Sequence, residues 1–190
     1  MIGGLARIIL YLLVVFLPIL LASRVGKSDG FLVDMGRNFA LAGFMILILQ
    51  FLIASRIKWI EQAFGLDLLL RFHKFIAVGA VGLLIIHPLL LTQGEAGWQI
   101  IFGLDLPWPI WAGKAALILL LGLVLVSMYQ SKIGLSFEKW RLGHNIFPPA
   151  ILALVFVHSW FAGDDLQLLS LQVLWVSVFI LAAVVFVYHR

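Results

Sequence analysis

The sequence has no cysteine and few charged side chains. Only 12% of its 190 residues are charged, whereas 64% are hydrophobic, and soluble domains carry about twice that share of charge. Iron–sulfur clusters, thiolate-ligated haem and c-type haem all need cysteine, so its absence excludes them. The shortage of charge excludes an ordinary soluble domain, and the mean hydropathy of +1.14 predicts an integral membrane protein.

Long apolar runs, separated by charged breaks, predict six membrane spans of about 20 residues each. The predicted spans are Ala6–Ala22, Phe39–Ala54, Leu68–Leu91, Pro109–Met128, Leu142–Ala162 and Leu168–Val187. The expected fold is an all-α membrane protein, a single six-helix bundle over residues 1–190 without a soluble flavin or nicotinamide domain. A secretory signal peptide is the alternative for the first run, because Arg7 precedes a short apolar core.

Basic residues are distributed unevenly between the two expected sides. With the N-terminus inside, the inner segments carry Arg7, Arg56, Lys58, Arg71, Lys74, Lys132, Lys139, Arg141 and Arg190, and the outer ones carry Arg24, Lys27 and Arg37. This excess predicts both termini in the cytoplasm, as in a multi-pass protein of a bacterial inner membrane. The net charge of +4 then reflects loops that face anionic lipid, so membrane lipid is an expected partner and nucleic acid is not.

Tryptophans fall at the predicted rims of the spans, as an aromatic belt requires. Trp59 and Trp140 lie at the expected inner rim, and Trp98, Trp108, Trp111 and Trp160 at the outer rim. Their positions agree with the six predicted spans.

Two of the predicted spans carry two histidines each, at the same spacing. His73 and His87 in the third span are fourteen residues apart, and so are His144 and His158 in the fifth. At about 100° per residue, each pair lies on one face of its helix, with about 21 Å between its members. Because both spans start on the same side, we expect His73 level with His144. His87 is then level with His158.

Facing imidazoles in a core without cysteine restrict the groups that they can bind. Zinc and di-iron centres favour Cys, Asp or Glu beside the histidines, and no acidic residue lies deep in either span. Haem b with two axial histidines remains. Ala77 and Ala80 lie between His73 and His87, with Gly79 and Gly82 nearby, and leave room for a porphyrin. The alternative is ordinary histidines that hydrogen-bond across a bundle, with small residues that serve close packing.

These two segments resemble a known family. The stretch "RFHKFIAVGAVGLLIIHP" is similar to the third helix, and "FEKWRLGHNIFPPAILALVFVHSW" to the fifth, of the ferric-reductase-like transmembrane domain of NADPH oxidases, metalloreductases and bacterial flavocytochromes. The resemblance implies two haem b groups between helices 3 and 5, with His73 and His144 as inner metal ligands and His87 and His158 as outer ones. It also implies electron transfer from a cytoplasmic flavin and NAD(P)H donor to an outer acceptor, such as a ferric chelate, dioxygen or a redox partner.

The sequence departs from the family pattern in two places. It reaches "VFVYHR" without a G-x-G-x-x-G loop, so FAD and NAD(P)H are expected only on a flavin reductase partner or on another part of a longer protein. Leu91 stands where oxygen-reducing relatives carry a second histidine on the third helix.

Arg37 resembles an arginine beside the outer haem of those relatives, and it is therefore the expected catalytic residue. Its alternative role is that of an interfacial side chain that extends toward water.

Two other functions fit the same residues. A stand-alone haem subunit, like that of the periplasmic methionine sulfoxide reductase system, takes quinone- or flavin-derived electrons to a periplasmic reductase. A histidine-relay proton or solute transporter belongs to a different class and binds no chromophore. An enzyme is expected here only as the haem-binding membrane part of an oxidoreductase.

Overall fold

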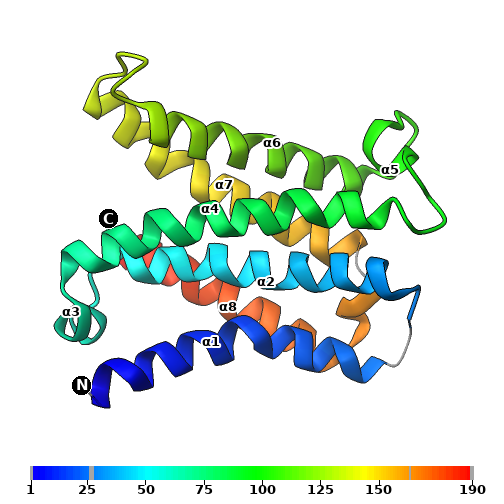
Figure 1. Ribbon diagram of the computed structural model, residues 1–190, viewed down its shortest axis with the longest axis horizontal. Helices are drawn as coiled ribbons and strands as arrows, with labels where there is room; N and C mark the ends of the chain where they lie inside the picture. The colour runs from blue at the N-terminus through cyan, green and yellow to red at the C-terminus, as the bar shows by residue number, and fades with distance from the viewer. Residues whose placement is uncertain (1, 26–27, 163, 189–190) are drawn as a thin grey trace. The chain divides into compact units, whose positions relative to one another are not determined.

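The computed structural model describes residues 2–25, 28–162 and 164–188, and every regular element within these ranges is a helix (Figure 1). The long helices are α1 (Ile2–Ala22), α2 (Phe31–Ala54), α4 (Leu66–Leu91), α6 (Trp108–Tyr129), α7 (Phe137–Ala162) and α8 (Leu169–Tyr188). The short ones are α3 (Lys58–Phe64), α5 (Gln99–Phe102), η1 (Ser23–Val25) and η2 (Asp164–Gln167). Lys27 and Arg190, which entered the charge count, lie outside the described residues.

Six of the described helices are long and apolar enough to cross a membrane, and each corresponds to one predicted span. Among the helices that begin earlier than the sequence pattern predicts, α2 at Phe31 and α7 at Phe137 differ most from the prediction. Hydropathy marks only the stretch that suits hydrocarbon, whereas a helix continues through the polar interface. The acidic residues Asp34 and Glu138 lie in these first turns, where the helix dipole favours a negative charge.

The chain divides into two compact units, which are described separately. The first unit comprises Met1–Ile101 and Asp165–Arg190, and the second comprises Phe102–Asp164. The third predicted span, α4, therefore belongs to the first unit, and the fifth, α7, belongs to the second. A single domain over all 190 residues stays a prediction.

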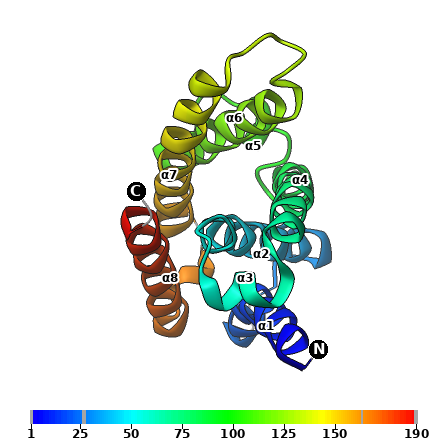
Figure 2. The same cartoon turned by 90° about the vertical axis from the view of Figure 1, so that its left-hand side faces the viewer.

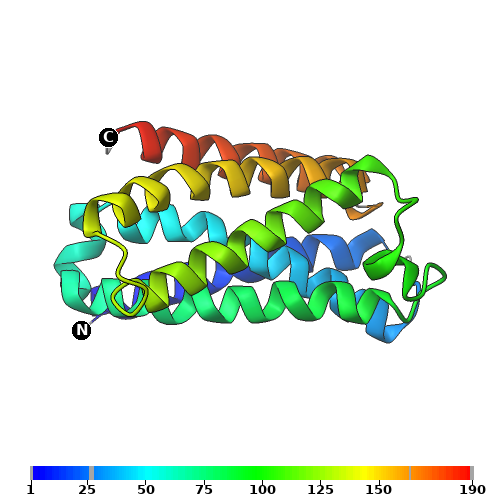
Figure 3. The ribbon, with the colours of Figure 1, turned by 90° about the horizontal axis from the view of Figure 1, so that it is seen from above.

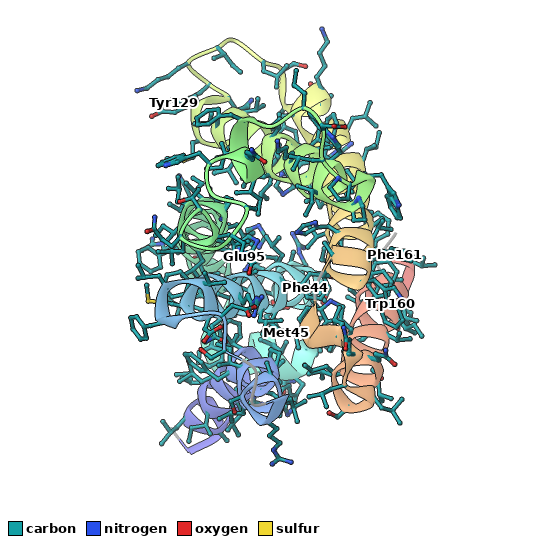
Figure 4. All side chains as sticks on the ribbon, turned by 90° about the vertical axis from the view of Figure 1, so that its right-hand side faces the viewer. Phe44, Met45, Glu95, Tyr129, Trp160 and Phe161 are labelled. Atoms are coloured by element: carbon teal, nitrogen blue, oxygen red, sulfur yellow. The ribbon has the colours of Figure 1, made fainter. Side chains whose placement is uncertain are left out.

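In the first unit, α2 is the central helix and packs against α1, α4 and α8 (Figure 2). Its middle segment, residues 41–50, is buried without interruption, as expected for a helix that is apolar on all sides. Phe44 of α2 stacks on Trp175 of α8 at a centroid distance of 4.5 Å, and each side chain is only 1% exposed. Figure 4 labels Phe44 and its buried neighbour Met45.

Glycines allow α2 and α4 to approach closely. A Cβ atom at Gly36 would lie 3.0 Å from the Leu90 Cβ and 3.2 Å from the carbonyl oxygen of His87. At Gly43, the same atom would lie 2.8 Å from the Leu84 side chain. Without a hydrophobic driving force between helices in lipid, such close backbone packing is a main source of helix association.

The second unit is built on the antiparallel pair of α6 and α7 (Figure 3). The chain turns between them through Gly134, whose φ of +65° is a conformation that glycine adopts without strain. At the other end of the pair, Trp108 of α6 packs against Phe161 of α7 with 5.0 Å between ring centroids. Phe161 is 61% exposed, as expected of an aromatic residue at a membrane interface.

Candidate functional site

The four histidines lie on the helices that the sequence predicts. His73 and His87 belong to α4, His144 and His158 belong to α7, and all four are half-buried. Each helix is continuous over its pair, so the fourteen-residue spacing keeps both histidines of a helix on one face. The level pairing between α4 and α7 joins two separately described units and stays a prediction.

His87 is oriented by a backbone carbonyl of the neighbouring helix. Its Nδ1 lies 2.9 Å from the carbonyl oxygen of Gly36 on α2. A carbonyl oxygen only accepts hydrogen bonds, so the proton of the neutral ring is on Nδ1 and the lone pair is on Nε2. Gly36 makes this bond possible, because any side chain there would press on the α4 backbone at His87.

His158 repeats this arrangement in the second unit. Its Nδ1 donates to the carbonyl oxygen of Pro109 on α6 at 2.8 Å, which again leaves the lone pair on Nε2. The ring lies directly over Gly113, where an added Cβ would come within 2.7 Å of Nδ1 and 2.8 Å of Cγ. The imidazole thus occupies the space that a side chain at position 113 would need.

His144 has a side-chain partner instead of a carbonyl. Its Nδ1 lies 3.4 Å from the hydroxyl oxygen of Ser127 on α6. The indole Nε1–H of Trp140 donates to the same oxygen at 3.2 Å. The Trp140 ring also stacks on the imidazole, with centroids 5.1 Å apart and an interplanar angle of 26°.

Arg37 is held in an ion-pair network at the start of α2. Its guanidinium pairs with the carboxylates of Asp29 and Asp34, the latter at 3.7 Å. Asp34 also accepts a hydrogen bond from the Ser28 hydroxyl at 2.5 Å. Arg37 directly follows Gly36, the residue that binds His87, so this network and the His87 ring lie at the same end of the first unit.

Sequence reasoning missed the groups that orient the histidines. Trp140 was assigned to the aromatic belt, although its place four residues before His144 puts both side chains on one helix face and was a usable signal. Gly36, Pro109 and Ser127 carry no comparable signal. Each reaches its histidine only through contacts between helices.

The expected space near Gly79 and Gly82 is present, but not on the histidine face. A Cβ atom at either glycine would meet nothing within 4 Å. At about 100° per residue, however, Gly82 lies on the opposite side of α4 from His73. Ala80, midway between the two histidines of α4, is fully buried. Gly79 lies about 80° from His87 on the same scale, so Gly82 adds nothing to the case for a porphyrin beside the histidines, and Gly79 lies at the edge of the histidine face.

The described residues suit a haem better than a multi-carboxylate metal centre. Among them, no three His, Cys, Asp or Glu side chains form a group that could hold a metal ion. A bis-histidine haem needs only two such ligands. Metal-binding histidines typically donate their second ring N–H to a carbonyl or another acceptor, which fixes the ligating nitrogen. His87 and His158 have this form.

Six apolar helices with two histidine pairs define the class, a multi-pass membrane protein with paired histidines on two of its spans. The family model of the ferric reductase like transmembrane component matches residues 39–155, which include His73, His87 and His144. His158 lies three residues beyond the matched segment. The chain belongs to this family of membrane oxidoreductase domains. It is also 24% identical over 125 residues to an uncharacterised protein of Archaeoglobus fulgidus, a match that covers 60% of this chain and 67% of that protein.

Proposed function

We propose that this chain carries electrons across a membrane through two b-type haems, from a cytoplasmic flavin and NAD(P)H donor to an acceptor on the outer side. His73 and His144 would hold the inner haem, and His87 and His158 the outer one. Family membership supports transmembrane electron transfer. The observation that carries the finer proposal is the orientation of His87 and His158, whose Nδ1–H groups bind backbone carbonyls.

The role of the protein in this proposal is to orient the ligating imidazoles, as the carbonyl oxygens of Gly36 and Pro109 do for His87 and His158. An Nδ1–H that donates to a fixed acceptor leaves Nε2 free and prevents rotation of the ring. A haem with two protein ligands supplies a one-electron carrier without an open coordination position. The apolar helices around the histidines keep water away, so that burial and hydrogen bonding at each imidazole set the potential.

Charge supports the proposed direction. Arg56, Lys58, Lys132, Lys139 and Arg141 belong to the segments that the positive-inside rule places in the cytoplasm. Basic surfaces attract acidic partners and raise their association rates. A separate flavin reductase that presents an acidic surface is therefore the donor that we propose.

The direct test is an absorption spectrum of the purified chain with a haem assay. We expect a Soret band, sharp α and β bands on reduction, and about two haems per chain. His73→Ala or His144→Ala should remove one haem, and His87→Ala or His158→Ala the other, as resolved by redox titration. His189→Ala, at the fifth histidine of the chain, is the control and should keep both.

Three results would contradict the proposal or a part of it. A protein that folds but binds no haem when haem is supplied would favour the histidine-relay transporter. Loss of the same haem in His73→Ala and His87→Ala would contradict the level pairing. Reduction by a quinol instead of a reduced flavoprotein would favour the stand-alone haem subunit.

We further propose that Arg37 assists electron transfer to the acceptor. Arg37 directly follows Gly36, whose carbonyl oxygen accepts the hydrogen bond from His87. Both residues lie near the start of α2, the end that we propose faces outward. Arg37→Lys keeps the positive charge, whereas Arg37→Ala removes the ion pairs with Asp29 and Asp34. We expect Arg37→Ala to slow stopped-flow reoxidation by ferric chelates several-fold without loss of haem, and Arg37→Lys to retain most of the rate. Equal rates in all three proteins would assign Arg37 a purely interfacial role.

A further inference from the structure

Ser127 differs from the partners of His87 and His158, because its hydroxyl oxygen lies within hydrogen-bond distance of two ring nitrogens. The indole N–H of Trp140 donates to it at 3.2 Å, and Nδ1 of His144 lies 3.4 Å away. With Nε2 of His144 as the proposed iron ligand, the proton is on Nδ1 and this nitrogen also donates to the oxygen. A hydroxyl oxygen has two lone pairs and can accept both bonds. All three residues belong to the second unit, and the contact joins α6 to α7.

The two donors compete for one oxygen. An indole N–H that binds Ser127 draws electron density from the hydroxyl and makes it a weaker acceptor for His144, because hydrogen bonds in a network polarise one another. The Nδ1 distances agree with a weaker hydrogen bond at His144. His87 and His158 lie 2.9 and 2.8 Å from carbonyl oxygens, whereas His144 lies 3.4 Å from the Ser127 oxygen. His144 therefore has the longest of the three Nδ1 contacts.

Stacking adds a second constraint on the same ring. Trp140 lies one helical turn before His144, and its indole plane is within 26° of the imidazole plane. The Trp140 side chain thus contacts both the His144 ring and the oxygen that lies nearest to its Nδ1. Trp140 and Ser127 act together on one imidazole.

We infer that Ser127, adjusted by the Trp140 indole, is a positioning residue that sets how strongly His144 donates electrons to a bound haem iron. This inference rests on the proposed function. A stronger hydrogen bond from Nδ1 gives the imidazole more anionic character, which stabilises ferric iron and lowers the midpoint potential. A weaker one raises the potential.

The test uses two substitutions that predict shifts of opposite sign. Ser127→Ala removes the acceptor of His144, so the potential of one haem should rise. Trp140→Phe removes the competing N–H but keeps an aromatic ring, so the potential of the same haem should fall. Spectroelectrochemical titration of the purified full chain gives both potentials, and the low-spin g values in EPR should change for that haem alone.

Two matched controls separate tuning from general disturbance. Ser127→Thr keeps the hydroxyl and should behave like the wild type. Ser23→Ala also removes a hydroxyl, which donates to the Leu20 carbonyl at the end of α1 at 2.9 Å, and it should shift neither potential.

The outcomes are distinguishable from failure of the proposed function, which would appear as a wild-type protein without haem. If Ser127→Ala loses one haem, the Trp140→Phe shift decides the matter, and a fall supports the inference. Shifts of the same sign in both variants, equal shifts of both haems, or no shift in either variant would overturn it.

Discussion

Gly113 and Gly122 are both glycines of α6, but their surroundings differ. A Cβ atom at Gly113 would lie within 2.8 Å of the His158 ring, whereas one at Gly122 would meet nothing within 4 Å. His158 cannot retreat from position 113 without weakening its hydrogen bond to Pro109. Substitution by alanine should therefore disturb the site at Gly113 and leave it unchanged at Gly122.

We expect Gly113→Ala to displace the His158 imidazole. Overpacking of this kind costs about 1–3 kcal/mol, and the haem proposed to depend on His158 should be lost or bound more weakly. Gly122→Ala is the control and should be neutral or stabilising, because alanine favours a helix over glycine by about 1 kcal/mol. Haem content and thermal unfolding in detergent measure both effects. Full haem content and unchanged stability in Gly113→Ala would contradict the expectation.

At the scale of single residues, the sequence identifies the histidines but not their partners. The fourteen-residue spacing depends only on helix geometry, so it could be recognised locally. The acceptor of His87, by contrast, is 51 residues away in the chain, and that of His158 is 49 residues away. Such pairs follow from how helices pack, and packing is not encoded in any short stretch.

At the scale of helices, α2 contacts α4 at Gly36 and at Gly43, and the atoms of α4 at these two contacts differ in how easily they can move. The Cβ of an alanine at position 36 would meet the backbone at His87, which cannot move without disturbing α4. At position 43 it would meet the Cγ and a Cδ atom of Leu84 at 2.8 Å, and this side chain has other rotamers.

We therefore expect Gly36→Ala to be more damaging than Gly43→Ala. The first should cost about 1–3 kcal/mol and break the hydrogen bond from His87, whereas the second should cost less because Leu84 can turn away. Unfolding of the two variants in detergent, together with their haem content, checks the order. Equal losses would show that α2 and α4 can separate locally at both contacts.

The six spanning helices were predicted correctly, and the errors lie at their ends. The first turns of α2 and α7 carry charged residues that a hydropathy pattern counts as breaks. Backbone hydrogen bonding continues through those turns, since the interface supplies water and, at Arg37, two carboxylates. Hydropathy measures where hydrocarbon is tolerated, and helix ends follow a different requirement.

At the scale of the whole molecule, the orientation in the membrane is open to a direct test because the sequence has no cysteine. Ser131→Cys and Glu95→Cys introduce single thiols at exposed positions beyond opposite ends of α6. With both termini in the cytoplasm, an impermeant maleimide added to intact cells should label Glu95→Cys and not Ser131→Cys. Labelling of both after permeabilisation is the control, and the reverse pattern in intact cells would invert the proposed direction of electron flow.

The resemblance carried by the two histidine segments is confirmed by the family match over residues 39–155. The sequence alone could not establish how α4 and α7 are aligned along their axes, because the two helices belong to different units. Their alignment depends on contacts among several helices, and the level pairing of histidines stays a prediction for the haem titrations.

The hydrogen bonds of His87 and His158 end on main-chain oxygens, and that of His144 ends on a side chain. Substitution does not remove a main-chain oxygen, although a side chain at position 36 would displace the one that accepts from His87. A serine hydroxyl, by contrast, is lost in one step. A single mutation can thus readily alter the hydrogen bond of His144. The geometry of the His87 and His158 rings tolerates most substitutions around them, except at Gly36 and Gly113. A designer who wishes to change the driving force for electron flow without rebuilding the protein would begin at position 127.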